Sequence, residues 1–111
     1  MPLTLRNQSN NIVQVAPVTT GLLMIETLTW TKESWVDYLY WQSQNKKTLK
    51  RINKLVTDTQ RSPFEGIGKP EPLKANLSGF WSRRIDDSNR LVYTVDSNQL
   101  TIISCRYRYE K

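Results

Sequence analysis

A chain of 111 residues is long enough for one independently folding domain and leaves no room for a second. Its 16 Lys and Arg residues against 10 Asp and Glu give a net charge of +6, which favours a polyanionic partner such as nucleic acid. The absence of histidine excludes histidine-based acid–base catalysis and most zinc sites, and the lone Cys105 excludes an intrachain disulfide. No apolar run is long enough to span a membrane or to form a secretory signal, so we expect a cytoplasmic protein.

Residues 1–23 differ in composition from the rest of the chain. They are rich in Asn, Gln, Thr and Val, carry a single charged residue, Arg6, and show no helical or strand periodicity. Such a segment predicts a poorly ordered N-terminal extension, with the folded domain over residues 24–111. Met24 precedes the first strand-like segment, so either translation begins there or residues 1–23 are a real extension.

One strand and two helices are predicted over the first half of the domain. Residues 25–30 alternate as in a strand, and Thr31 supplies a hydroxyl N-cap for a helix that begins after it. A second helix follows after Asn45, with apolar residues at spacings of three and four. Its other face is basic, and we interpret this face mainly as solvated surface. The basic residues there are Lys46, Lys47, Lys50, Arg51 and Lys54.

A long segment rich in proline and glycine separates the helices from the last strands. Residues 62–79 contain three prolines and three glycines, which excludes a helix or a regular strand there, and long loops of this kind are often functional. Three strands follow at 80–85, 90–95 and 100–109, joined by turns rich in Asp, Ser and Asn. The order β-α-α-β-β-β predicts an α+β fold in which a two-helix hairpin packs on one face of an antiparallel sheet.

Glu71 lies between Pro70 and Pro72 in the long loop. Two prolines restrict the backbone on both sides of the carboxylate, which suits a side chain that must point in one direction. Glu71 is therefore either a general base or a solvated acid in a rigid turn, and residue type alone favours the solvated acid.

Four arginines are predicted to lie on or near one face of the sheet. Alternation along the last strand puts Arg106 and Arg108 on the same side, and the two preceding strands contribute Arg84 and Arg90. Guanidinium groups match the geometry of phosphate oxygens, so the cluster is either a surface that binds RNA or a solvated basic face. Trp30, Trp35 and Trp41 fit a core or a subunit interface better than base stacking, whereas Trp81, next to the arginines of its strand, stays open between the two.

From Leu28 onward the sequence resembles the YoeB toxins of the RelE/ParE superfamily, over nearly all of residues 24–111. The most distinctive part is the long loop that runs into Asn-Leu-Ser-Gly-Phe-Trp-Ser-Arg-Arg-Ile. Residues 1–23 have no counterpart in the family pattern. The resemblance is carried by Trp-Thr-Lys-Glu-Ser-Trp (30–35), Asp-Tyr-Leu-Tyr-Trp-Gln (37–42), Ser-Pro-Phe-Glu-Gly-Ile-Gly-Lys-Pro-Glu-Pro-Leu-Lys (62–74), the ten residues just named (76–85), Asn-Arg-Leu-Val-Tyr (89–93) and Ser-Cys-Arg-Tyr (104–107).

The resemblance implies a microbial-ribonuclease-like fold and the toxin half of a type II toxin–antitoxin system. It also implies a homodimer that is neutralised by a YefM-type antitoxin and that cuts mRNA in the ribosomal A site without a metal or other cofactor. Matched position by position, Glu71 corresponds to the family's general base and Arg90 to its phosphate-binding arginine. Lys74 and Arg84 match positions that line the same groove, and Tyr109 matches the terminal tyrosine.

Position 108 departs from the family pattern, which has a histidine there as general acid. This chain has Arg108, and Glu110 and Lys111 extend the end beyond Tyr109. Arginine gives up a proton reluctantly, so either Arg108 is a cationic clamp or an unusual acid, or the enzyme is slow or inactive. A positioned acid is typically worth about 10²- to 10⁴-fold in rate, so we expect reduced activity rather than none.

Two other functions stay open on the sequence alone. A catalytically silent relative would bind its antitoxin and co-repress its operon, and Arg108 is the residue in its favour. A poison of a protein target such as gyrase, as in the ParE branch, is disfavoured by the retained Glu71. Of the three functions, we expect ribosome-dependent mRNA cleavage.

Overall fold

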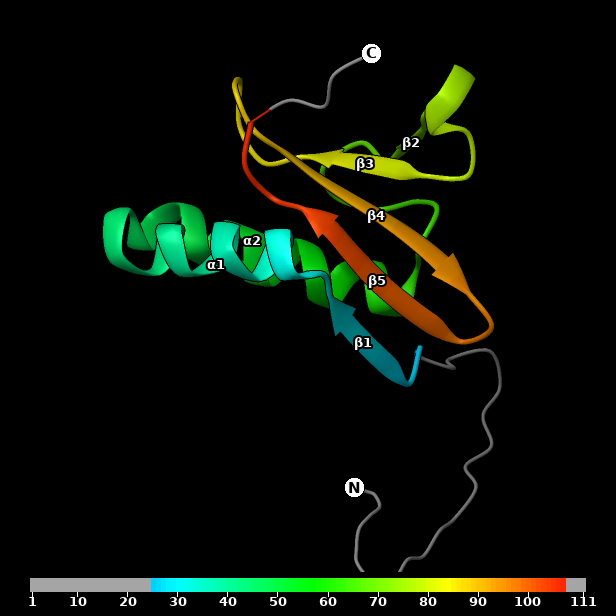
Figure 1. Cartoon of the computed structure of the whole chain (residues 1–111), viewed down its shortest axis with the longest axis horizontal. Coiled ribbons are helices and arrows are strands. Elements are labelled where there is room, and N and C mark those ends of the chain that lie inside the picture. Colours follow the sequence, from blue (N-terminus) through cyan, green and yellow to red (C-terminus); the bar gives the residue numbers. More distant parts are fainter. Residues whose placement is uncertain (1–24, 108–111) are drawn as a thin grey trace, which may run out of the picture.

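The computed structural model describes residues 25–107, which form a five-stranded sheet with two helices on one side (Figure 1). The predicted segment 1–23 and the predicted site residues Arg108 and Tyr109 lie outside the described residues. In the described range, no helix is long and apolar enough to cross a membrane. In chain order the elements are β1 (Thr27–Trp30), α1 (Lys32–Gln44), α2 (Lys46–Arg61), β2 (Glu71–Pro72), a 3-10 turn η1 (Ala75–Leu77), β3 (Trp81–Arg84), β4 (Arg90–Asp96) and β5 (Gln99–Ser104).

Both predicted helix starts are confirmed. The Thr31 hydroxyl accepts a hydrogen bond from the Ser34 backbone N–H at 3.0 Å, which satisfies one of the unpaired donors in the first turn of α1. The Asn45 backbone N–H donates to the Trp41 carbonyl at 2.9 Å, and its side-chain oxygen accepts from the Thr48 N–H at 3.1 Å. Because one residue both ends α1 and caps α2, the two helices form a tight hairpin.

The sheet has the order β1-β5-β4-β3-β2, and it is mixed. Strands β3, β4 and β5 pair antiparallel in succession, as predicted, and β2 pairs antiparallel with β3. The expectation of a wholly antiparallel sheet is wrong for β1, which pairs parallel with β5. The helical hairpin and the long loop carry the chain to the far edge of the sheet, and three reversals then bring it back to β1 in the same direction (Figure 1).

The long loop contains a short strand that the sequence did not predict. β2 is only two residues long and pairs with β3 in the register Glu71↔Ser82 and Pro72↔Trp81. Proline is tolerated there because β2 is an edge strand, so its missing N–H removes no ladder hydrogen bond to a further strand. The last strand is also shorter than predicted, because β5 ends at Ser104.

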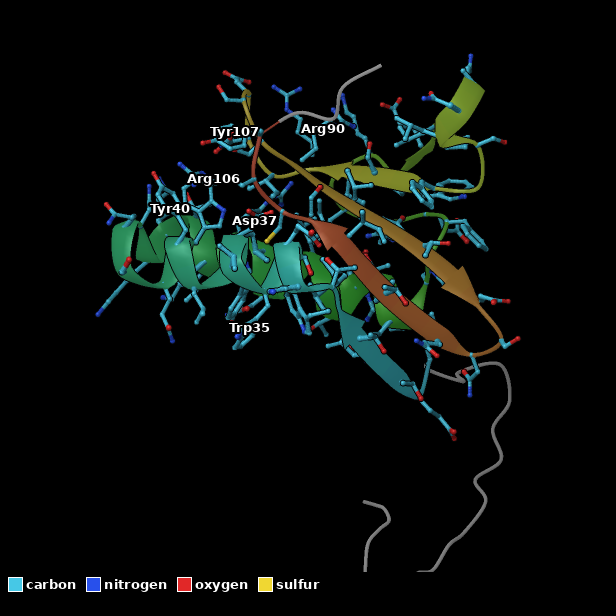
Figure 2. All side chains as sticks on the ribbon, in the orientation of Figure 1. Trp35, Asp37, Tyr40, Arg90, Arg106 and Tyr107 are labelled. Atoms are coloured by element: carbon cyan, nitrogen blue, oxygen red, sulfur yellow. The ribbon has the colours of Figure 1, made fainter. Side chains whose placement is uncertain are left out.

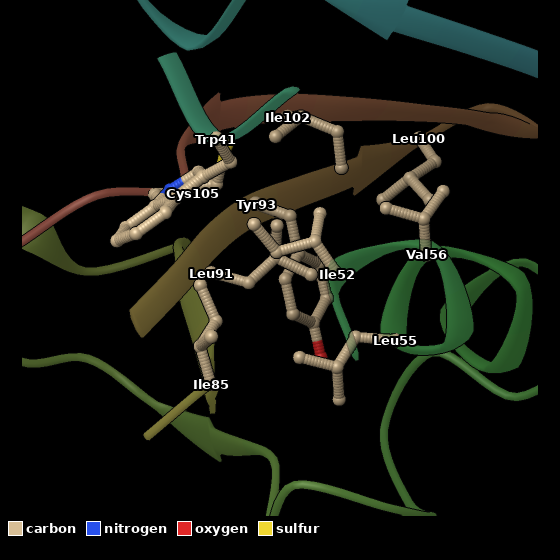
Figure 3. Packing of buried hydrophobic residues seen from close by; sticks show 10 residues of the cluster. All are labelled: Trp41, Ile52, Leu55, Val56, Ile85, Leu91, Tyr93, Leu100, Ile102 and Cys105. Carbon is tan, nitrogen blue, oxygen red and sulfur yellow. The ribbon is translucent and has the colours of Figure 1, made fainter. Parts of the chain in front are cut away.

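The hydrophobic core lies between the helices and one face of the sheet (Figure 3). Leu91 and Tyr93 of β4 are fully buried there, as the predicted alternation requires. The core cluster consists of Trp41, Ile52, Leu55, Val56, Ile85, Leu91, Tyr93, Leu100, Ile102 and Cys105. With both helices on this face, the opposite face of β2, β3 and β4 is left for polar side chains.

Candidate functional site

Glu71 and Arg90 meet on the face of the sheet opposite the helices. An Arg90 Nη2 donates to Glu71 Oε2 at 3.1 Å, and Arg90 Nε donates to Ser82 Oγ at 3.0 Å. The Arg90 side chain is 20% exposed and the Glu71 side chain 52% exposed. A carboxylate that solvent can reach is thus held against a guanidinium group, at the place where the sequence suggested a general base and a phosphate-binding arginine.

The register of the sheet explains why these side chains meet. In antiparallel pairs, directly opposite residues share a face of the sheet. Glu71 is opposite Ser82, and Arg84 is opposite Arg90. Because alternate residues of a strand also share a face, Ser82 and Arg84 lie on the same side, so β2, β3 and β4 each contribute to one polar surface. The side chains in between, such as that of Leu91, point into the core.

Arg84 and Lys74 lie at the border of this surface. The Arg84 guanidinium forms an ion pair with Asp87 in the turn that follows β3, and the Arg84 side chain is 49% exposed. Lys74 is exposed and lines a shallow pocket together with Glu71. The pocket continues along the chain to Leu77 at the end of η1. The structure therefore places two exposed cations near the Glu71–Arg90 pair.

Arg106 is placed elsewhere, because the chain leaves the strand at Ser104. The guanidinium carbon of Arg106 lies 3.4 Å from the ring centroid of Tyr40 on α1 and 4.5 Å from that of Tyr107 (Figure 2). Strand alternation therefore does not extend to Arg106, and the guanidinium faces aromatic rings instead of joining Arg84 and Arg90 in an open cluster. Its predicted contact with RNA stays a prediction.

A buried arginine that the sequence analysis did not single out supports the site from the core side. Arg83 is fully buried, and its Nη1 donates to Asp58 Oδ2 of α2 at 2.6 Å. Nη1 also donates to the Ile67 carbonyl at 3.0 Å, Nη2 donates to the carbonyl oxygens of Ser62 at 2.5 Å and Glu65 at 3.0 Å, and Nε donates to the Tyr93 hydroxyl at 3.3 Å. Buried charges are almost always paired in this way, and here the pairing fixes the first half of the long loop to α2 and β3.

Two signals in the sequence point to this network in retrospect. Asp58 stands among the apolar positions of α2, and Arg83 stands at a core-facing position of β3, so each charge needs a partner inside the fold. Burial alone would raise the pKa of Asp58, but hydrogen bonds from Arg83, Ile67 and Arg61 together outweigh it and lower that pKa. The carboxylate is therefore stabilised in its charged form.

Gly66 and Gly68 allow the loop to approach this ion pair closely. Both residues have positive φ, 126° and 80°, which is accessible to glycine without steric cost. A Cβ at Gly66 would lie 2.1 Å from Asp58 Oδ2, so no larger residue fits without displacing the carboxylate. The Gly68 carbonyl accepts a hydrogen bond from the Arg84 N–H at 2.7 Å, which joins the loop to β3 two residues before Pro70.

The arrangement has the components of acid–base chemistry on a phosphodiester. A carboxylate such as Glu71 can accept a proton, and a guanidinium group such as Arg90 can stabilise negative charge that develops beside it. Lys74 and Arg84 add positive charge near this pair. Within residues 25–107, no three side chains of the metal-ligating types gather at one place.

The comparisons with known proteins agree with the fold. A family model described as a YoeB-like toxin of bacterial type II toxin–antitoxin systems matches residues 30–109. The toxin YoeB of Escherichia coli is 62% identical over 82 residues, covering 74% of this chain and 98% of that protein. A solved YoeB/ParE toxin from Agrobacterium tumefaciens superposes with a TM-score of 0.74 at 44% identity, covering 76% of this chain and all of that one.

Two solved structures from Staphylococcus aureus are similar to the same extent. A YoeB dimer is 49% identical and a YoeB–YefM complex is 50% identical, each with a TM-score of 0.70 and each covering 75% of this chain and 97% of that one. The matched range contains Glu71, Ser82 and Arg90, the three residues that meet on the free face of the sheet. With the family model spanning most of the domain and close relatives sharing its fold, the chain belongs to the YoeB-like toxins of bacterial type II toxin–antitoxin systems.

Proposed function

We propose that this toxin is an endoribonuclease that cuts mRNA in the ribosomal A site, with Glu71 as the general base and Arg90 as the group that stabilises the transition state. The observation that carries the proposal is the contact between Arg90 and Glu71 at 3.1 Å on an open face of the sheet. A base and a phosphate-binding cation must both touch the same nucleotide, and this pair is close enough to do so.

The reaction that fits these groups is an attack of the ribose 2′-OH on the neighbouring phosphorus. The Glu71 carboxylate takes the 2′ proton, a new bond forms between the 2′-oxygen and phosphorus, and the bond to the 5′-oxygen breaks. The products are a 2′,3′-cyclic phosphate and a 5′-hydroxyl, and the departing 5′-oxygen takes its proton from water. Ser82 and Glu71 use two of the five Arg90 donors, and the guanidinium has others with which to hold the equatorial oxygens.

Lys74 and Arg84 are proposed to bind phosphates on either side of the scissile bond, because both are exposed cations next to the pair. The Arg106 guanidinium is already stacked on Tyr40, and this contact favours a role in holding the chain over direct binding of RNA. Arg108 and Tyr109 are assigned to the leaving group. An arginine at 108 stabilises the charge on the departing 5′-oxygen, as a cation, more readily than it donates a proton.

The partners of this toxin are proposed from its relatives and from the chemistry. The Staphylococcus aureus relatives are described as a YoeB dimer and as a YoeB–YefM complex, which supports a homodimer and a YefM-type antitoxin here. The ribosome would orient the RNA, and such positioning can supply several kcal/mol of the lowering of the barrier. A ribosomal target also implies a cytoplasmic location.

The test is to induce the wild type, Glu71→Gln and Glu65→Gln in growing bacterial cells and to map mRNA 5′ ends by primer extension. Glu65→Gln is the matched control, because Glu65 is an exposed acid in the same loop. We expect cuts in phase with codons for the wild type and the control, and none for Glu71→Gln at equal protein levels. Cuts that persist in Glu71→Gln would show that this carboxylate is not the base.

One observation favours a second candidate function, a catalytically silent toxin relative that only binds its antitoxin. The observation is Arg108 at the position where the family has its general acid. Growth inhibition and mRNA cuts would both be absent for the wild type if this second function were correct. Growth arrest without cuts would instead indicate a protein target of the kind poisoned by the ParE branch.

A further inference from the structure

The segment that follows β5 is fixed to α1 at Cys105. Cys105 is fully buried, and its backbone N–H donates to Asp37 Oδ2 at 3.0 Å. Its carbonyl oxygen accepts from Trp41 Nε1 at 2.8 Å, and its thiol donates to the Ser34 carbonyl at 3.8 Å. Burial, followed by the nearby charge of Asp37, raises the pKa of the thiol to about 12, so Cys105 serves as an anchor and is not a reactive group.

The next residue, Arg106, adds a second attachment to the same helix. Its guanidinium carbon lies 3.4 Å from the Tyr40 ring centroid and 4.5 Å from the Tyr107 ring centroid, so it lies against two aromatic rings (Figure 2). The charge of Arg106 also acts on the partly buried Asp37, whose pKa is nevertheless raised, first by burial. α1 thus presents an acid and an aromatic ring to one guanidinium.

Tyr107 then connects this anchored segment to the site. Its N–H donates to Asn89 Oδ1 at 2.6 Å, and its carbonyl oxygen accepts from the Arg90 N–H at 3.1 Å. Its φ of +66° is costly for a residue with a side chain, and such a conformation persists only where surrounding contacts hold it. The chain therefore continues to position 108 from a point hydrogen-bonded to the backbone of the phosphate-binding arginine.

We propose that Arg106, stacked on Tyr40, is a positioning residue that holds Tyr107 and, through the hydrogen bonds of Tyr107 with Asn89 and Arg90, keeps the backbone of Arg90 in place beside Glu71. We call the stacking of Arg106 on Tyr40, together with the hydrogen bonds that hold Tyr107, the Arg106 clamp. Its role in the reaction rests on the proposed nuclease function, whereas the clamp as a structural feature does not. Arg106 is not needed to touch RNA in this role, because it acts through the residues that follow it. This explains why a cation near the site has its planar face covered by two rings.

The test compares Tyr40→Leu with Tyr40→Phe in the full chain. Phenylalanine keeps the ring face on which Arg106 stacks, and leucine removes it. Tyr38→Leu is the matched control, because Tyr38 lies on the same helix but packs against Trp30 and Trp35 instead of Arg106. The first readout is hydrogen exchange of the Tyr107 amide by NMR, with the amides of β4 and β5 as a check that the fold is intact.

We expect Tyr40→Leu to speed exchange of the Tyr107 amide roughly 5- to 30-fold, while Tyr40→Phe and Tyr38→Leu leave it near the wild-type rate. Arg106→Gln should behave like Tyr40→Leu. In single-turnover cleavage on programmed ribosomes, Tyr40→Leu should lower the rate at saturation by a similar factor without weakening RNA binding. Tyr40→Phe should restore that rate.

The outcomes separate the clamp from the nuclease. Unchanged exchange of the Tyr107 amide in Tyr40→Leu and Arg106→Gln would overturn the clamp, whatever happens to RNA. Faster exchange with an unchanged cleavage rate would overturn the positioning role. Should the wild type cut no RNA while Tyr107 responds as expected, the nuclease proposal would fail and the clamp would stand. Loss of RNA binding in Arg106→Gln but not in Tyr40→Leu would assign Arg106 to RNA contact instead.

Discussion

Arg108 sets the expected pH dependence of the reaction, because arginine stays protonated across the physiological range whereas histidine titrates near a pKa of about 6.5. We predict that Arg108→His raises the single-turnover cleavage rate at pH 6 to 7, by up to about 10²-fold where proton donation to the 5′-oxygen limits the wild type. The same variant should lose rate as pH rises above the histidine pKa. Rates measured from pH 5.5 to 9 on programmed ribosomes check both effects.

The wild type is the control for this pH profile of the cleavage rate. Its guanidinium group stays protonated, so its rate should not fall at alkaline pH as that of Arg108→His does. Lower activity of Arg108→His at every pH would mean that the permanent charge of Arg108, and not a missing proton, is what the leaving group requires. The cyclic phosphate product would be the same in either case, because the attack by the 2′-OH depends on Glu71 and Arg90.

At the scale of elements, the ion pair between Arg83 and Asp58 ties β3 and the long loop to α2. We predict that Asp58→Asn lowers the free energy of unfolding at pH 7 by about 3 kcal/mol, because it leaves the fully buried Arg83 without its counter-charge. This is the low end of the range for a broken buried ion pair, since the Asp58 side chain retains 10% exposure. Urea unfolding at pH 7 measures the difference.

The pH dependence of that difference has a definite sign. The folded-state pKa of Asp58 lies below its ordinary value, so the stabilisation is fully present above an ordinary carboxyl pKa of about 4. It is lost as the pH falls through the folded-state pKa. The difference in free energy of unfolding between the wild type and Asp58→Asn should therefore be smaller at pH 3 than at pH 7. Asp87→Asn, which removes the exposed partner of Arg84, is the control and should change stability little. An equal difference in free energy of unfolding at both pH values would contradict the stabilising role of the charged Asp58 carboxylate.

Some of the elements could be predicted from the sequence and others could not. Helix starts at Thr31 and Asn45 were predictable because a cap is a local interaction between residues three apart. The parallel pairing of β1 with β5 was not, since it depends on where the chain re-enters the sheet after the helical hairpin and the long loop. The end of β5 at Ser104 was missed for a similar reason: α1 draws Cys105 out of the strand pattern through contacts nearly seventy residues away.

For the site, the family resemblance predicted that Glu71 and Arg90 act together. The spacing of the two residues in the sequence did not predict that they would meet. Their contact depends on the register of β2, a two-residue strand with no local signal of its own. Arg106 was assigned to the arginine cluster by alternation, but its position depends on Tyr40, which local pattern cannot reveal. Arg83 and Asp58 were each predictable in principle as charges at core positions, although their pairing with one another was not.

At the scale of the whole molecule, the positive charge is divided between two sides of the sheet. The exposed lysines of α2 lie on the side of the helices, whereas Lys74 lines a pocket together with Glu71. Both groups attract RNA over a distance, but only cations that touch phosphates release counterions when RNA binds. The two groups should therefore differ in how their removal changes the salt dependence of binding.

We predict that Lys74→Gln makes the slope of log affinity against log salt shallower by about 0.7, the value for one phosphate contact with single-stranded RNA, whereas Lys54→Gln leaves the slope unchanged. Titration of a short RNA blocked at the 2′ position, between about 50 and 200 mM salt, measures this without cleavage. The same charge is removed in each variant, so net charge cancels from the comparison. Equal changes of slope would place RNA across both sides of the molecule and would remove the free face of β2, β3 and β4 as the sole path of the substrate.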